Sequence, residues 1–133
     1  MLYRISIYWL YIGHRYIGVR YMKDHGFTNE MRKGFLKMFI LKIIEQKPIH
    51  GYDIIHEIVE KTHGNWEPSP GSVYPALEFL MSKGYIFMEE NDRKKVYSIT
   101  PEGREAVRYI EKRRQEMLQE FNSIFGDLPE TKP

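Results

Sequence analysis

The sequence predicts a mainly α-helical fold with a small two-stranded β-hairpin, an α+β arrangement. Three stretches within residues 31–84 carry apolar side chains at helical spacing. After them, two β-rich runs, 85–88 and 95–99, flank a polar turn at Asn91-Asp92. A fourth amphipathic stretch follows the second run. The predicted order is therefore three helices, a hairpin and a final helix.

Length and composition limit the classes of protein that this chain can belong to. With 133 residues, it should form one domain with a small core. It has no cysteine, which excludes disulfides, Cys-ligated zinc and cysteine catalysis and fits a cytoplasmic location. Of 20 basic and 18 acidic residues, four and two lie in residues 1–30, leaving 16 of each in the remainder. Any case for nucleic-acid binding must therefore depend on local patches of charge.

Residues 1–30 form an N-terminal extension of unusual composition. Residues 1–22 hold five of the ten tyrosines, and their uncharged run is too short to span a bilayer. Residues 23–30 are polar and resemble a linker. Three interpretations stay open: a helix that packs on the domain or its partner, a membrane-surface helix, and a translation start assigned too early, with Met31 the true first residue. We prefer the third, then the first.

The first two helices of the domain have clear apolar faces. The first spans residues 31–46 and ends at Lys47-Pro48, and the second begins near Gly51 and stops at residues 63–65. The expected buried residues are Leu36, Phe39, Ile40, Ile43 and Ile44 in the first helix, and Tyr52, Ile55, Ile58 and Val59 in the second.

The third helix lies within residues 69–84, and its start can be read in two ways. If Ser69 is the cap, Pro70 occupies the favourable first position but Pro75 bends the helix. If Gly71 or Ser72 is the cap, Pro75 lies next to the first turn. In both cases small or hydroxylated groups surround free N–H donors, an arrangement that suits a phosphate or a base edge. The expected core residues are Val73, Leu77, Leu80 and Met81.

The last helix begins at Thr100-Pro101-Glu102, which combines a cap, a first-position proline and an acid. It should run to about Phe125 and end at Gly126. Its apolar residues step by three and four and make a wide heptad seam. We expect this seam to mediate self-association, although it could also fold back on its own domain. Its members are Val107, Ile110, Arg114, Met117, Phe121, Ile124 and Leu128, widened by Ala106, Leu118 and Phe125.

The order of these elements is that of a winged helix-turn-helix. In such a domain the third helix enters the major groove of DNA and the hairpin forms a wing. The tip of the hairpin carries Arg93-Lys94-Lys95, a dense basic cluster in an otherwise neutral domain. Cations at this edge would contact backbone phosphates. We divide the chain into residues 1–30 (extension), 31–100 (DNA-binding domain), 101–128 (dimerisation helix) and 129–133 (disordered tail).

The chain carries a series of motifs in this order: His50-Gly51-Tyr52, residues 71–77 (Gly-Ser-Val-Tyr-Pro-Ala-Leu), Gly84, residues 93–100 (Arg-Lys-Lys-Val-Tyr-Ser-Ile-Thr) and Gly103. Together they resemble the PadR-like transcriptional regulators, over about residues 31–125. The resemblance implies a homodimeric repressor that binds a two-fold symmetric operator and dimerises through its C-terminal helix. Many relatives respond to small aromatic or lipophilic compounds. Residues 1–30 have no counterpart in the pattern.

The candidate site residues follow from these positions. At the third helix, Glu78 and Ser82 are exposed but lie further from its mouth. Tyr52 could offer a hydroxyl to phosphate, but core packing is the preferred role. The candidate DNA contacts are Ser69, Gly71, Ser72, Tyr74, Pro75, Arg93, Lys94, Lys95, His50, Tyr52, Lys33 and Lys37. The candidate dimerisation residues are Val107, Ile110, Arg114, Met117, Leu118, Phe121, Ile124 and Phe125.

Other functions have weaker support in the sequence. Histidines and acids at 50, 53, 56, 60 and 63 have zinc-compatible spacing, but the buried side of that helix faces elsewhere, so we expect no metal and no other cofactor. No phosphate loop, nucleophile elbow or catalytic triad is present, so an enzyme is not expected. The alternative is a winged helix that binds protein instead of specific DNA. The aromatic residues along the dimer seam could also line a pocket for a small effector.

Overall fold

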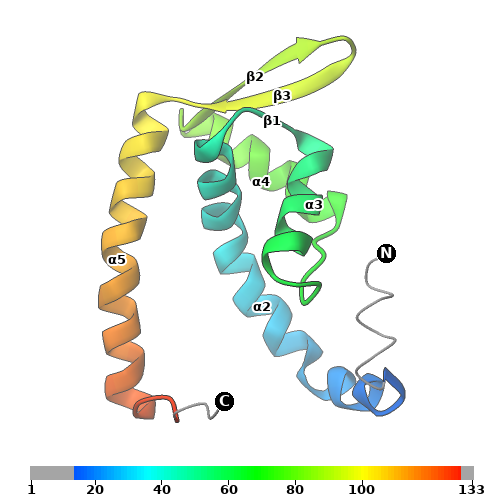
Figure 1. Ribbon diagram of the computed structural model, residues 1–133, viewed down its shortest axis with the longest axis vertical. Coiled ribbons are helices and arrows are strands. Elements are labelled where there is room, and N and C mark those ends of the chain that lie inside the picture. The colour runs from blue at the N-terminus through cyan, green and yellow to red at the C-terminus, as the bar shows by residue number, and fades with distance from the viewer. Residues whose placement is uncertain (1–13, 130–133) are drawn as a thin grey trace.

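The computed structural model of the protein describes the backbone of residues 14–129 and the side chains of residues 26–129. Four helices and a small sheet make up this part of the chain (Figure 1). In chain order the elements are α2 (His14–Gln46), β1 (Ile49–His50), α3 (Gly51–Lys61), α4 (Pro70–Ser82), β2 (Ile86–Asn91), β3 (Lys94–Ile99) and α5 (Pro101–Phe125).

Helix α2 starts much earlier than the sequence pattern indicated. The expected linker over residues 23–30 is helical and continues without a break into the helix expected from Met31. Its polar composition is that of an exposed helix surface, where the Lys33 ammonium lies 2.9 Å from the Glu30 carboxylate. The N-terminal part of α2 projects away from the domain (Figure 1). Residues 1–13 lie outside the described part, so the three interpretations of the extension stay predictions.

The sheet has three antiparallel strands in the order β1-β3-β2, one more than expected. The additional strand β1 has two residues and pairs with β3 through Ile49↔Tyr97 and His50↔Val96. A two-residue strand is too short to show an alternating pattern in the sequence. The hairpin turn is formed by Asp92 and Arg93, with φ values of 52° and 67°. Positive φ at both positions is typical of the tight turn whose twist matches a hairpin, one residue later than expected.

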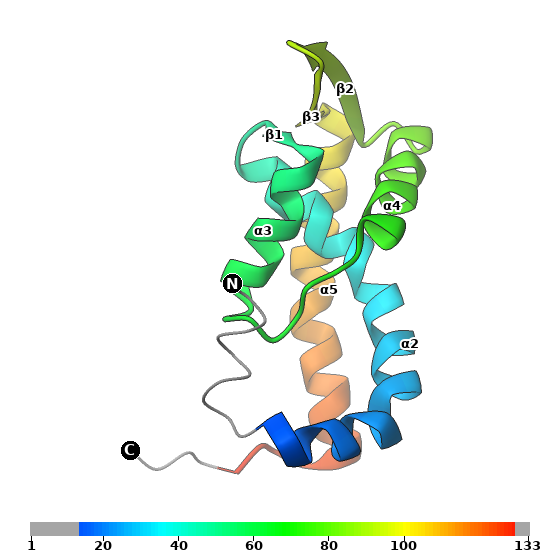
Figure 2. The ribbon, with the colours of Figure 1, turned by 90° about the vertical axis from the view of Figure 1, so that its right-hand side faces the viewer.

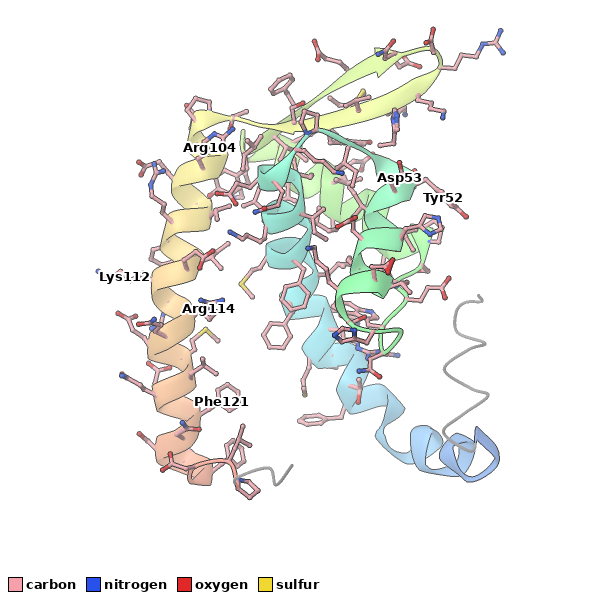
Figure 3. The ribbon with its side chains drawn as sticks, in the orientation of Figure 1. Tyr52, Asp53, Arg104, Lys112, Arg114 and Phe121 are labelled. Atoms are coloured by element: carbon pink, nitrogen blue, oxygen red, sulfur yellow. The ribbon has the colours of Figure 1, made fainter. Side chains whose placement is uncertain are left out.

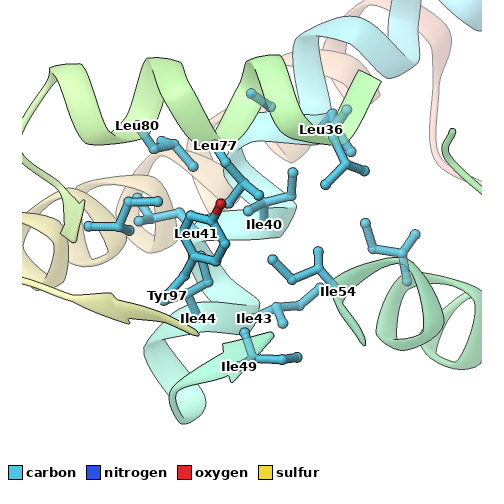
Figure 4. Close-up of a cluster of buried hydrophobic side chains, with 14 of the residues drawn as sticks. Leu36, Ile40, Leu41, Ile43, Ile44, Ile49, Ile54, Leu77, Leu80 and Tyr97 are labelled. Atoms are coloured by element: carbon cyan, nitrogen blue, oxygen red, sulfur yellow. The ribbon is translucent and has the colours of Figure 1, made fainter. Parts of the chain in front are cut away.

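The core lies where α3, α4 and the sheet pack around the C-terminal half of α2 (Figures 2 and 4). Ile54 and Leu41 are buried although they were not expected to be, whereas Tyr52 is 61% exposed and Phe39 is 40% exposed. Burying one such aliphatic side chain contributes about 1.5–3 kcal/mol. The largest fully buried side chains are Ile40, Leu41, Ile44, Ile54, Ile58, Leu77 and Val73.

The start of α5 is fixed against the segment that precedes β2. The Thr100 hydroxyl accepts a hydrogen bond from the Gly103 amide at 3.0 Å and donates one to the Gly84 carbonyl at 2.6 Å. The Thr100 amide also donates to the Tyr85 carbonyl at 3.0 Å. The expected cap at Thr100 is therefore confirmed, as is the helix end at Phe125 before Gly126. Within the described part, no helix is long and apolar enough to cross a membrane.

Candidate nucleic-acid interface

Helix α4 presents an exposed N-terminal half next to the core. Ser69 is its cap residue and Pro70 its first residue, so the first of the two expected starts is the one observed. The Ser69 side chain does not cap the helix; its Oγ lies 3.2 Å from the Ser72 Oγ. The five expected contacts in this helix or at its cap, Ser69, Gly71, Ser72, Tyr74 and Pro75, are all exposed. They are small, hydroxylated and aromatic groups at the helix start. All of them except Tyr74 line one concave surface between α4 and α2.

The buried side of α4 consists of Val73, Ala76, Leu77 and Leu80, while Met81 is only partly buried. Pro75 lies inside the helix and has no N–H, so the Gly71 carbonyl four residues earlier loses its helical partner. Glu78 and Ser82 are exposed, as expected. One side of α4 is thus held by the core and the other is open to a partner.

His50 and Tyr52 flank the start of α3. The His50 side chain does not cap the helix, and its Nδ1 is buried without a hydrogen-bond partner among the described residues. The preferred core role of Tyr52 is wrong: its ring lies at the surface, edge-on to His56 with 5.1 Å between centroids. Figure 3 shows Tyr52 and Asp53 on the outer side of α3. The Tyr52 hydroxyl is therefore accessible.

The wing ends in the basic cluster Arg93, Lys94 and Lys95, and all three residues are exposed. None of them makes an ion pair with another residue that the structure describes. Lys95 pairs across the hairpin with Glu90, so the acidic residues of β2 offset part of the charge. Arg93, in the turn itself, is the cation furthest along the hairpin.

A concave surface lies between the N-terminal half of α4 and α2 and encloses a volume of about 770 Å³. Lys33 and Lys37, the two expected contacts of α2, line it together with Arg32. The Lys37 ammonium lies 4.9 Å from the Phe79 ring centroid, and the Lys83 ammonium lies 5.5 Å from the same ring. A cation over an aromatic face is stabilised by the ring quadrupole. These two lysines are held beside α4 by Phe79.

Arg32 and Phe79, which line this surface, were not among the expected contacts, and neither was Lys83, whose ammonium lies over the Phe79 ring. The Arg32 guanidinium stacks 5.1 Å from the Trp66 ring centroid and donates to the Asn65 carbonyl at 3.0 Å. Residues 32 and 65 are 33 positions apart, so no local spacing indicates the contact. Lys83 could have been found as an exposed cation at the C-cap of α4.

The expected dimerisation seam divides into two parts along α5. Val107 is buried and Ile110 is partly buried against the core of the same chain. Figure 3 shows Arg114 and Phe121 on the side of α5 that faces α2, with Lys112 on the opposite side. The outer members of the seam, all exposed, are Arg114, Leu118, Phe121, Ile124 and Phe125, and Met117 is half-buried.

An apolar groove of about 470 Å³ lies between α2 and α5. Phe35, Phe39 and Phe121 contribute aromatic rings to it, and Lys42 bridges it at 2.8 Å to Glu111. The hydrogen bond with Glu111 raises the pKa of Lys42, and the same bond lowers the pKa of Glu111. Both groups are therefore charged at neutral pH, and the ion pair joins the two helices. No group of three or more histidine and acidic side chains in the described part could hold a metal ion.

Comparison with known proteins agrees with this arrangement. The chain is 38% identical over 90 residues to "Transcriptional regulator YqjI" of Escherichia coli K12, a match covering 65% of this chain and 42% of that protein. The chain thus spans less than half the length of the curated relative. A transcriptional regulator from Clostridium thermocellum has TM-score 0.66 at 24% identity, covering 74% of this chain and 96% of that one. A PadR family regulator from Eggerthella lenta has TM-score 0.68 at 20% identity, covering 78% and 93%.

Bacillus subtilis PadR, solved in complex with operator DNA, has TM-score 0.50 at 21% identity, covering 74% of this chain and 51% of that one. These structural likenesses confirm the winged-helix fold expected from the sequence. Residues 40–109, more than half of the chain, match the transcriptional regulator PadR-like family. With the motifs at residues 50–52, 71–77 and 93–100 placed at α3, α4 and the wing, the chain belongs to the PadR-like family of transcriptional regulators.

Proposed function

We propose that the protein is a homodimeric repressor that binds a two-fold symmetric DNA operator. The observation that carries this proposal is the exposed start of α4, where five small, hydroxylated or aromatic residues are accessible to a partner. In a winged helix this part of the helix reads base edges in the major groove. The Ser69 and Ser72 hydroxyls are our candidates for this role, with Gly71 and Pro75 allowing close approach. The Tyr74 phenol is our candidate for a contact to a base edge or a phosphate at the same helix start.

The wing supplies contacts that do not depend on sequence. Arg93, Lys94 and Lys95 make no ion pair with another described residue, so they are available to backbone phosphates. Lys33 and Lys37 are proposed to contact flanking phosphates from α2. His50 and Tyr52 are placed at the start of α3 and are weaker candidates. Because these contacts release counterions, affinity should fall steeply with salt.

Dimerisation is assigned to the C-terminal half of α5. Its apolar side chains are too numerous to stay in water, and beyond Ile110 the side chains of the seam are at most half-buried by their own chain. A symmetric pair of α5 helices would bury them and place the two copies of α4 about one helical turn of DNA apart, roughly 34 Å. We keep the proposed division into residues 1–30, 31–100, 101–128 and 129–133, noting that α2 crosses the first boundary.

Release by a small aromatic or lipophilic effector is a second element of the proposal. The groove between α2 and α5 has the volume of a small-molecule site and is lined largely by aromatic, methionine and aliphatic side chains. Phe39 lines this groove and also contacts Trp66, which lies before α4. A ligand in the groove would therefore touch a side chain that supports the DNA-reading helix. We place this activity in the cytoplasm, where a regulator can reach its DNA.

Fluorescence anisotropy with the DNA upstream of the protein's own gene tests the proposal. The titration uses excess random competitor DNA and two salt concentrations. Tight binding that survives the competitor, with two chains per site, is the expected result. Binding that disappears with competitor indicates phosphate attraction alone. No binding at either salt concentration supports the alternative, a winged-helix module that binds protein without specific DNA recognition.

A further inference from the structure

Three elements meet at one point beside the start of the DNA-reading helix. Gly51 is the buried first residue of α3, Tyr74 lies in α4 and Tyr97 lies in β3. A Cβ atom on Gly51 would lie 3.0 Å from both Cε1 and the hydroxyl oxygen of Tyr74, and 3.2 Å from Cε1 of Tyr97. Both rings therefore rest against the backbone at Gly51, and there is no room for even a methyl group without a shift.

Gly51 and Tyr97 together form the surface on which the Tyr74 ring rests, which we call its seat. Tyr97 is the immobile side of this seat. It is 3% exposed, and strand pairing holds it from both sides, opposite Ile49 in β1 and Met88 in β2. Burial raises the pKa of the Tyr97 hydroxyl, and the nearby Tyr74 and Glu78 raise it further, so Tyr97 stays neutral at physiological pH. A buried, neutral and strand-held ring cannot easily move aside.

Tyr74 is held on one side only. Its ring edge and hydroxyl oxygen lie against Gly51, while 39% of the residue stays exposed. A side chain that is already fixed loses less conformational entropy when it binds. A phenol also donates strongly to a charged oxygen. Tyr74 thus has the properties of a pre-positioned donor to a phosphate group.

We propose that Gly51 is a positioning residue for DNA binding: with Tyr97 as a wall, it seats the Tyr74 ring so that the Tyr74 hydroxyl is held in place to donate to a backbone phosphate of the operator. This inference rests on the proposed function. It gives the glycine a role in DNA binding although the glycine itself need not contact DNA.

The substitution Gly51→Ala tests the seat with a single methyl group. The Tyr74 ring must shift outward by a few tenths of an ångström, and we expect DNA binding to weaken about tenfold, or about 1.4 kcal/mol. Because no charge is lost, the factor should be the same at every salt concentration. The matched control is Gly34→Ala in α2, where a Cβ meets nothing within 4 Å. This control should bind DNA as the wild type does.

A double-mutant cycle separates positioning from general damage. Tyr74→Phe removes the hydroxyl, so Gly51→Ala should have no further effect in that background. If the double variant loses affinity by the product of the two single factors, the proposal is overturned. It is also overturned if Gly51→Ala binds DNA with wild-type affinity. If the wild-type protein binds no specific DNA, the proposed function is overturned, and the positioning role of Gly51, which depends on that function, is overturned with it.

A measurement on the wild-type protein remains decisive if Gly51→Ala does not fold. Tyrosine ring carbons are labelled with ¹³C, and the Tyr74 signal is assigned by its loss in Tyr74→Phe. On addition of operator DNA, we expect the Tyr74 signal to shift, while that of Tyr109, exposed on α5, stays in place. An unshifted Tyr74 signal at saturating DNA would overturn the proposal.

Discussion

At Gly103 the first turn of α5 comes so close to the segment before β2 that only glycine fits. A Cβ atom there would lie 2.1 Å from the Tyr85 carbonyl oxygen, which is backbone and cannot rotate away. The same carbonyl accepts a hydrogen bond from the Thr100 amide, so displacing the carbonyl would also break this bond at the N-cap residue of α5. The position of α5 relative to the sheet thus depends on the absence of a side chain at residue 103.

Gly103→Ala is expected to destabilise the fold by roughly 1–3 kcal/mol, the range for inserting a methyl group into a packed site. Thermal or denaturant unfolding followed by circular dichroism measures the change. Gly34→Ala is the control, because its methyl group enters open space within a helix and should be neutral or slightly stabilising. Equal stability of the two variants would contradict the close approach at Tyr85.

Arg93 should contribute affinity without sequence preference. It is the outermost cation of the wing, and Arg93→Ala should weaken binding to all DNA equally and reduce the salt slope by about one. The slope of log Kd against log salt concentration gives the result. Lys112→Ala, on the side of α5 that faces away from α2, is the charge-matched control and should leave the slope unchanged. An unchanged slope in Arg93→Ala would remove the wing from the interface.

At the scale of elements, the loop between α3 and α4 is anchored to α2 by Trp66. Its ring is edge-on to Phe39 with 5.7 Å between centroids and has the Arg32 guanidinium on it. The Trp66 amide also donates to the Thr62 hydroxyl at 3.2 Å. These contacts fix the chain three residues before the Ser69 cap of α4.

Trp66→Ala should lower stability by roughly 1–3 kcal/mol, because it removes an aromatic pair and a cation–π contact together with partly buried area. The midpoint of chemical unfolding is the readout. Tyr109→Ala, at an exposed position of α5, removes a similar ring without these contacts and should change little. Equal effects of both substitutions would show that Trp66 does not anchor the loop.

Local chemistry predicted both ends of α5, although it did not predict the start of α2. Thr100-Pro101 and Gly126 mark α5 as observed, because caps and stop signals act within one turn. Contacts between distant residues could not be predicted in the same way. The strand β1 exists only because β3 passes beside it, and Ile54 replaces Tyr52 in the core because the neighbouring elements fix how α3 is rotated. The contacts of Lys37 and Lys83 with the Phe79 ring likewise depend on tertiary packing, as does the contact of Arg32 with Trp66.

For the molecule as a whole, we propose that the exposed seam of α5 links association to DNA binding. Phe121→Glu should produce monomers, because a charge would then occupy an apolar interface, and the fold should survive because Phe121 is 52% exposed. Sedimentation gives the mass and circular dichroism the fold. Lys112→Glu, on the opposite side of α5, should leave the mass unchanged. A dimer that persists in Phe121→Glu would place the interface elsewhere.

Hydroxyl-radical footprinting of the wild-type protein on its operator tests the central claim most directly. A symmetric dimer that inserts two copies of α4 should protect two equivalent patches of backbone, related by two-fold symmetry and separated by about one helical turn, roughly 34 Å. The wings should add protection at the outer edges of both patches. One protected patch without symmetry would contradict the account, because it would mean that a single chain, and not a pair joined through α5, binds the DNA.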